Sequence, residues 1–269
     1  NLVKKNRETI QKKEKLEQEK KAISKTKDKS QFEKSKKISK EIETLESSQK
    51  KLQKQIDLIL NFIPNIALND VPLGKDEKSN KELNKIGEVP KFDFKIQSHY
   101  EIGKKLNLMD FDVATKTSGS RFVFLKGKLA ELERAISNFM IDIHTKEFGY
   151  QEISPPLIAS ENTMFGTGQL PKFENDQFEI KLEGKEKKFL IPTAEVILTN
   201  MVRENSVKLN TLPIRLVAST ACFRKEAGSY GKDTKGMLRQ HQFYKVELVS
   251  IVEPEKCIEE LKRMTGCAE

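Results

Sequence analysis

The amino-acid sequence predicts an α+β protein, in which an N-terminal antiparallel hairpin of two helices precedes a domain built on an antiparallel sheet with flanking helices. Heptad spacing of apolar residues near the N-terminus indicates the paired helices. Two apolar-rich runs near the C-terminus, separated by a segment rich in Gly, Ser, Asp and Lys, indicate paired strands. A chain of 269 residues is long enough for two domains. We expect an arm at residues 1–63, a linker at 64–96 and the sheet domain at 97–269.

The second helix of the arm, at about 31–62, carries an unbroken heptad seam. Its positions are separated by alternating steps of four and three residues: Ile38, Ile42, Leu45, Gln49, Leu52, Ile56, Ile59 and Ile63. The sparser apolar stripe of the first helix, at about 1–26, consists of Val3, Ile10, Leu16 and Ile23. A polar stretch predicts the turn near 26–31, and Pro64 ends the second helix. A coiled coil that pairs between two chains is the alternative.

The positive charge of the chain is concentrated in this arm. The whole chain carries 49 Lys and Arg against 40 Asp and Glu, a net charge of +9. Residues 1–60 contain 18 basic and 10 acidic side chains, so their net charge is +8 and the remainder is close to neutral. A basic arm on a neutral body predicts a polyanionic partner, with RNA as the first candidate. The alternative is that Lys and Glu only solvate a long helix.

Cysteine and histidine are scarce. The three cysteines, Cys222, Cys257 and Cys267, are too few for a disulfide framework, and we expect Cys222 to be a buried small apolar residue. With three histidines and no CxxC pair, we expect no zinc site made by protein ligands alone. Neither a membrane span nor a secretory signal is predicted, although the chain does not begin with Met.

The region between linker and C-terminal strands contains a predicted helix, a loop and a capped turn. Apolar spacing over Phe122–Lys146 predicts a long helix, followed by a short strand at Gly149–Ile153 and two prolines. The segment MFGTGQLPKF at 164–173 predicts a loop. In FLIPTAEVILTN, at 189–200, a strand and a proline precede a helix for which Thr193 is a suitable N-cap.

The two C-terminal strands, at Pro213–Phe223 and Gln240–Val252, form a predicted antiparallel hairpin with a long connection. Gly228, Gly231 and Gly236 lie in that connection and favour a turn or loop. A helix at about 254–264 follows the second strand.

Strand periodicity groups the charged residues of the hairpin. Side chains alternate between faces with a period of two, so Arg224 and Glu226 share one face of the first strand. Arg239, Phe243 and Glu247 share one face of the second. Arginines suit phosphate oxygens, an aromatic ring suits a base, and carboxylates suit Mg²⁺ and amines. The set therefore predicts a site for a nucleoside triphosphate with its metal, and an ordinary solvated sheet surface is the alternative.

The stretch FRKEAGSYGKDTKGMLRQHQFYKVE, at 223–247, resembles motif 2 of the class II aminoacyl-tRNA synthetases, and within that class the seryl-tRNA synthetases. The pattern is nearly continuous over about 25 residues, which makes the resemblance specific. The segments at 71–77, 164–173 and 189–200 are also similar to that family. The helix, strand and Pro156 that end at GYQEISPP resemble its motif 1.

The resemblance implies a cytoplasmic enzyme that uses ATP and Mg²⁺ to activate serine as seryl-adenylate and then transfers it to tRNA(Ser). It implies that the basic arm holds the tRNA and that residues 129–156 join two subunits in a homodimer. The roles it implies are Arg224 for the α-phosphate and the serine carboxylate, Glu226 for the adenine amino group, Arg239 for the γ-phosphate, Phe243 for stacking on adenine, Glu247 for serine and Mg²⁺, and Thr193 and Glu195 for the amino-acid pocket.

One feature of the family is not found. Class II enzymes carry a third motif, a Gly-rich strand and helix with an Arg that contacts ATP, and nothing after Glu247 resembles it. We therefore expect a fragment truncated at both ends, without part of its sheet and inactive by itself. Two alternatives stay open. A relative that activates amino acids for a carrier protein would lack the arm, and a non-catalytic coiled-coil RNA-binding protein would not need the residues at 224–247.

Overall fold

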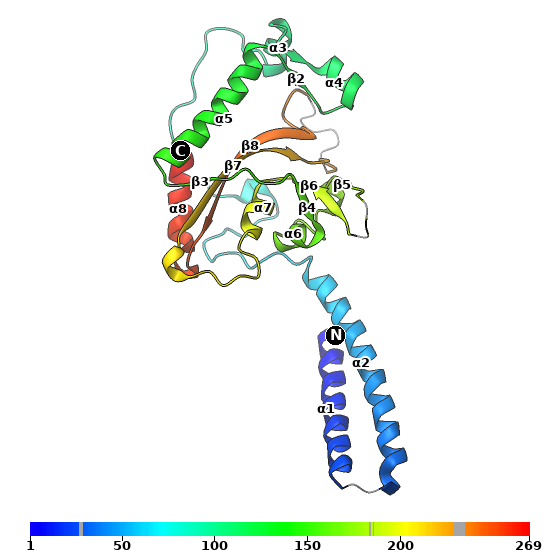
Figure 1. Cartoon of the computed structure of the whole chain (residues 1–269). Coiled ribbons are helices and arrows are strands. Elements are labelled where there is room, and N and C mark those ends of the chain that lie inside the picture. The colour runs from blue at the N-terminus through cyan, green and yellow to red at the C-terminus, as the bar shows by residue number, and fades with distance from the viewer. Residues whose placement is uncertain (27–28, 183, 185, 229–234) are drawn as a thin grey trace. The chain divides into compact units, whose positions relative to one another are not determined.

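The computed structural model describes residues 1–26, 29–182, 184, 186–228 and 235–269. It divides into two compact units, residues 1–85 and 86–269 (Figure 1). The first is a helical hairpin with an extended tail, and the second contains helices and three small sheets. The predicted α+β class is therefore confirmed. Among the described residues, none of the helices combines the length and apolarity needed to cross a lipid bilayer.

The arm consists of α1 (Leu2–Thr26) and α2 (Phe32–Leu60), which pack against each other as an antiparallel pair. The predicted seam is confirmed from Ile38 to Ile56, which are only 6% and 8% exposed. Its predicted end is wrong, because Ile59 and Ile63 are 53% and 58% exposed.

The buried side of α1 contains a polar residue, Asn6, that was not among the apolar residues predicted to form its stripe. Asn6 is 7% exposed, whereas the predicted seam residue Val3 is 51% exposed. The Asn6 side-chain amide donates to Gln53 Oε1 across the hairpin at 2.9 Å. A polar pair in a helical seam lowers stability but favours one alignment of the helices.

Residues 61–97 are exposed and contain one short 3₁₀ helix, η2 (Glu77–Ser79), as their only helix or strand. This agrees with the irregular segment expected between arm and sheet domain.

The second unit contains six α-helices among its described residues: α3 (His99–Lys105), α4 (Phe111–Ser118), α5 (Lys128–Lys146), α6 (Glu161–Gly166), α7 (Glu195–Asn200) and α8 (Cys257–Ala268). Its main sheet is β3 (Gln151–Glu152), β7 (Ile214–Phe223) and β8 (Gln242–Ile251), in that order. A second sheet has the order β4 (Ile158–Ser160), β6 (Lys188–Leu190), β5 (Glu179–Ile180), and a third pairs β1 (Met109–Asp110) with β2 (Phe124–Leu125).

The predicted C-terminal hairpin is confirmed as β7 and β8, paired antiparallel from Ile214↔Ile251 to Phe223↔Gln242. The short strand β3 adds to β7 in parallel, so the main sheet is mixed rather than purely antiparallel. Gly228 and Gly236 lie in the connection between the strands, and Gly231 lies outside the described residues.

β7 is buried on both of its faces. Leu216 and Ala218 pack in a cluster with α7, whereas Val217 packs with Ile141 of α5. Figure 1 shows α5 and α7 on opposite sides of the β7–β8 hairpin. Coverage on both faces explains why β7 reads as a nearly continuous apolar run.

Two predicted boundaries in this unit are wrong. The long helix begins at Lys128 and not at Phe122, because residues 124–125 form β2 and Gly127 adopts a left-handed φ of 52°. The expected loop at 164–173 begins inside α6, where Met164 is completely buried.

A buried ion-pair network attaches α8 to the hairpin. Glu260 is 7% exposed and accepts from Arg215 of β7 at 2.8 and 2.9 Å. Arg263 also donates to Glu260 and reaches the Tyr150 hydroxyl at 2.8 Å. Hydrogen bonds, first of all from Arg215, hold the pKa of Glu260 well below its usual range.

Candidate active site

A pocket of about 450 Å³ opens at the end of the main sheet where β7 ends. Its walls come from the loop after α6, the connection from β6 to α7, and the two ends of the β7–β8 connection. The lining residues are Gln169, Phe173, Asp176, Gln177, Pro192, Thr193, Arg224, Glu226, Gly228 and Arg239. Four of the seven residues predicted for the site, Thr193, Arg224, Glu226 and Arg239, therefore line one pocket.

The residues of β8 obey the predicted alternation. Phe243 lies opposite Cys222, and Glu247 lies opposite Ala218, on one face of the hairpin. The prediction is wrong for Arg239, because this residue precedes the strand, which begins at Gln242.

The predicted alternation is wrong for Arg224 and Glu226. β7 ends at Phe223, and Glu226 has a left-handed φ of 51°, so neither residue belongs to the strand. They line the same pocket because a tight turn, and not a strand, directs them there.

Arg224 joins the pocket to the aromatic ring of β8. Its guanidinium lies 5.2 Å from the centre of the Phe243 ring, and its Nε donates to the Pro192 carbonyl at 3.2 Å. The two contacts hold the planar group in place on the pocket wall. An arginine fixed in this way presents a planar, charged donor suited to phosphate or carboxylate oxygens.

Arg239 and Glu226 form an ion pair across the pocket at 3.2 Å. The Glu226 side chain is 14% exposed and that of Arg239 is 48% exposed. The more exposed arginine can exchange this partner for an anionic ligand at little cost in solvation.

A second cluster lies beside the first. The Thr193 hydroxyl donates to Glu247 Oε2 at 2.6 Å, and Lys245 donates to the Thr193 oxygen at 2.8 Å. Lys245 and Glu247 also form an ion pair. A hydroxyl, a cation and a carboxylate within contact of one another can bind a small polar zwitterion.

Lys245 was not predicted from the sequence, although its odd number places it on the same face as Phe243 and Glu247. Neither were Asp176 and Gln177, which come from a distant loop without a recognisable pattern.

Glu195 is the first residue of α7, and its amide donates to Thr193 Oγ1 at 3.2 Å. The expectation that Thr193 is the N-cap is wrong, because Ala194 holds that position and no side chain caps the helix; Thr193 lies one residue earlier and accepts from the Glu195 amide. Burial, and to a smaller extent the Glu247 carboxylate, raises the pKa of Glu195.

Cys222 is completely buried on the β7 side of the site, and burial raises the pKa of its thiol. This confirms the expectation of a buried small apolar residue. Such a thiol is a poor nucleophile at neutral pH.

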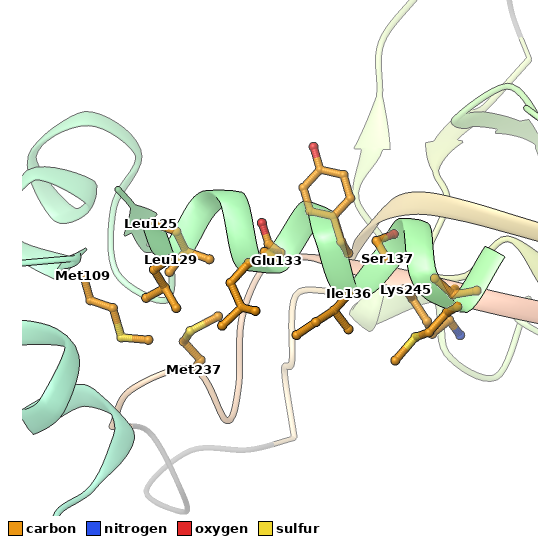
Figure 2. A pocket seen from close by; sticks show the side chains of 12 residues that line it. Met109, Leu125, Leu129, Glu133, Ile136, Ser137, Met237 and Lys245 are labelled. Carbon is orange, nitrogen blue, oxygen red and sulfur yellow. The ribbon is translucent and has the colours of Figure 1, made fainter. Parts of the chain in front are cut away.

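A separate apolar cavity of about 320 Å³ runs along α5. Figure 2 shows Met109, Leu129 and Met237 converging at one end of it. Tyr244, Lys245 and Val246 of β8 also line it, so Lys245 borders this cavity as well as contacting Thr193 and Glu247.

Comparisons with known proteins place this arrangement in a family context. The family model described as tRNA synthetase class II core domain (G, H, P, S and T) matches residues 178–269. A serine–tRNA ligase of Pelagibacter ubique is 64% identical over 264 residues, covering 98% of this chain and 63% of the relative. A serine–tRNA ligase of Ehrlichia canis is 54% identical over 239 residues, covering 89% of this chain and 55% of the relative.

Two solved structures have the same fold. The seryl-tRNA synthetase of Pyrococcus horikoshii, complexed with ATP, superposes with a TM-score of 0.85 and is 31% identical, covering 98% of this chain and 65% of that one. The cytoplasmic serine–tRNA ligase of Naegleria fowleri, in complex with AMP, gives a TM-score of 0.84 at 30% identity, covering 99% and 62%. The chain thus spans somewhat under two thirds of the length of these relatives.

Proposed function

We propose that this chain, which belongs to the seryl-tRNA synthetase family, acts in the ATP-dependent ligation of L-serine to tRNA(Ser) through a seryl-adenylate. The observation that carries the proposal is the juxtaposition of two clusters. The Arg224–Phe243 stack and the Arg239–Glu226 pair suit a nucleotide, and the adjacent Thr193–Lys245–Glu247 cluster suits a small hydroxylated zwitterion. Relatives solved with ATP and AMP support the nucleotide assignment.

In the proposed activation step, a serine carboxylate oxygen attacks the α-phosphorus of ATP in line, and pyrophosphate leaves. The protein contributes orientation and charge neutralisation rather than covalent chemistry. Arg224 would bridge the α-phosphate and the serine carboxylate, since it is fixed beside both clusters. In the second step, a hydroxyl at the tRNA 3′ end attacks the acyl carbon, and AMP leaves.

The other ATP contacts follow from the pocket walls. Phe243 would stack on adenine, Glu226 would accept from its amino group, and Arg239 would turn from Glu226 to the γ-phosphate. The solvent-exposed position of Arg239 supports this exchange of partners.

Mg²⁺ would enter with ATP. Among the described residues, no group of three or more His, Cys, Asp or Glu side chains could hold a metal ion. The phosphates must then supply most of the ligands, as is usual for Mg²⁺ bound with a nucleotide. Glu247 would contribute a carboxylate oxygen, at the cost of its ion pair with Lys245.

Serine would be recognised through its ammonium and hydroxyl groups. Glu195 and Glu247 offer negative charge to the ammonium, and Thr193 offers a hydroxyl. A pocket that hydrogen-bonds a substrate hydroxyl discriminates strongly against the analogue that lacks it, because its own polar groups would be left unpaired.

The basic arm would bind the tRNA. The net charge of +8 over residues 1–60 and the exposure of most of the described Lys and Arg side chains there support contacts with phosphates.

We also propose a homodimer joined through residues 129–156. Apolar residues on α5 support this interface, because Leu132, Ile136 and Phe139 are 52%, 44% and 63% exposed. A contiguous apolar surface of this kind is typical of an association site.

The test is ATP–pyrophosphate exchange by the full-length protein, with serine and with each other small amino acid. We expect exchange with serine and little with alanine. Exchange with another amino acid only would disprove the serine assignment. Exchange with serine but no charging of tRNA(Ser) would favour a carrier-protein acceptor.

A further inference from the structure

We propose that Arg121 is a positioning residue for the ATP site, because it holds the turn at residues 224–227 in the conformation that the site needs. The inference rests on the proposed function. Arg121 lies between α4 and β2, outside the pocket lining and outside all the segments assigned to substrates.

The turn is a strained element. Glu226 has a left-handed φ of 51°, which residues other than glycine adopt only where the surroundings compensate for it. Backbone strain of this kind is concentrated at functional sites. The groups that hold the turn are therefore candidates for a role in the reaction.

Arg121 is the charged donor to the turn. Its NH1 donates to the Glu226 carbonyl at 3.0 Å and to the Lys225 carbonyl at 3.4 Å. Hydrogen bonds from an ionised donor are stronger than neutral ones. Arg121 itself has a left-handed φ of 65°, so two strained residues are joined directly.

His241 attaches Arg121 to the base of the turn. Its amide donates to the Arg121 carbonyl at 3.0 Å, and its own carbonyl accepts from the Arg224 amide at 3.0 Å. Its Nδ1 lies 2.9 Å from the Arg224 carbonyl, which can only accept, so Nδ1 carries the proton. The rings of Phe122 and Phe178 lie 5.4 and 5.7 Å from the His241 ring and fix its orientation.

Asp176 holds the opposite side of the turn. Its carbonyl accepts from the Lys225 amide, and its Oδ1 accepts from the Ala227 amide, both at 2.8 Å. Carbonyls of the turn thus face Arg121, and amides face Asp176. The turn is clamped between two residues of opposite charge.

The clamp acts on the nucleotide side of the site. Arg224 and Glu226 lie within the turn, and Glu226 orients Arg239. Thr193, Lys245 and Glu247 belong to the start of α7 and to β8, which the turn does not carry. Loss of the clamp is therefore expected to weaken ATP binding more than serine binding, because serine keeps its contacts outside the turn and only the proposed contact of its carboxylate with Arg224 is disturbed.

The experiment compares Arg121→Ala and Arg121→Lys with the wild type, in the full-length protein. We expect Arg121→Ala to raise KM for ATP roughly ten-fold in the exchange assay, with a smaller rise in KM for serine. Arg121→Lys keeps the charge and should recover part of the loss. Arg203→Ala is the matched control, since Arg203 also donates two hydrogen bonds in this unit, to Thr163 and Asn200.

A second measurement does not depend on activity. Hydrogen–deuterium exchange at the Lys225 and Ala227 amides should accelerate in Arg121→Ala and not in Arg203→Ala. An unchanged KM for ATP, or a lower kcat with both KM values unchanged, would overturn the proposal, as would unchanged amide protection. If the wild type shows no serine-dependent exchange, the proposed function fails, and amide protection still decides whether Arg121 holds the turn.

Discussion

The helical arm and the β7–β8 hairpin are both antiparallel pairs, but they use their residues in opposite ways. In α1 and α2, Asn6, Ile38 and Ile56 are the buried residues among those described, and nearly all charged side chains are exposed. In the hairpin, β7 is covered on both faces and the charged groups pair with one another.

This difference in how charged residues are used predicts how each region binds its ligands. The arm offers many similar charges, each of small effect, so its binding should be collective and sensitive to salt. The hairpin offers single groups in fixed positions, so its chemistry should depend on individual residues.

Arg224→Ala should have the largest effect, because it removes the donor fixed between both clusters. We expect serine-dependent ATP–pyrophosphate exchange to fall about a thousand-fold. Arg203→Ala is the control and should stay close to the wild type. A near-wild-type rate for Arg224→Ala would contradict the view that the hairpin, unlike the arm, depends on single residues.

Deletion of residues 1–63 should separate the two regions. Exchange should stay within about two-fold of the intact protein, since the residues of the site lie in the second unit. Charging of tRNA(Ser) should fall at least about a hundred-fold, because the phosphate contacts are lost. Steady-state charging at several tRNA concentrations measures this, and efficient charging by the shortened protein would contradict the role of the arm.

Glu260→Gln tests whether the hairpin also depends on a single group for stability. Removal of the carboxylate leaves Arg215 and Arg263 partly buried without their partner, and should lower the free energy of unfolding by about 2 kcal/mol near neutral pH.

The effect of Glu260→Gln should depend on pH. The folded-state pKa of Glu260 is lowered from 4.5, so its contribution is complete above that value and is lost as the pH falls below it. Urea unfolding of wild type and variant at several pH values checks this. A difference that stays constant down to low pH would argue against the ion pair as its source.

Lys50→Gln in the arm should have the smallest effect. Lys50 is exposed on α2, so the free energy of unfolding should change by less than about 0.5 kcal/mol. If Lys50 contacts a phosphate, the salt dependence of tRNA affinity should weaken by about one counterion. A large loss of charging from this one change would show that the arm, too, depends on single residues.

Regular periodicity made much of the fold predictable. Heptad spacing indicated the two helices, and apolar runs with glycines between them indicated β7 and β8. The exposure of Ile59 was not predictable, because spacing within α2 alone does not say which seam positions have a partner on the other helix. Asn6 was missed because a polar residue breaks the apolar pattern that defines a seam.

The candidate site was predictable where it lies on a strand. Phe243 and Glu247 follow from a period of two, whereas the turn at Glu226 does not, since nothing local marks a glutamate for a positive φ. Asp176 and Arg121 reach the site only through tertiary contacts. Resemblance to a family suggested the proposed chemistry, and the geometry added Lys245 to the candidate site.

The alternation of side chains along β8 restricts which insertions and deletions the gene can tolerate. Its odd-numbered residues Phe243 and Glu247 contact the groups of the site, whereas its even-numbered residues Tyr244 and Val246 line the cavity along α5, which Lys245 also borders. Insertion or deletion of one codon within this strand would exchange the two sets, since a shift of one residue turns every side chain to the other face. Single substitutions in this strand keep the alternation of its side chains, whereas an insertion or deletion of one residue would disrupt the site and the cavity together.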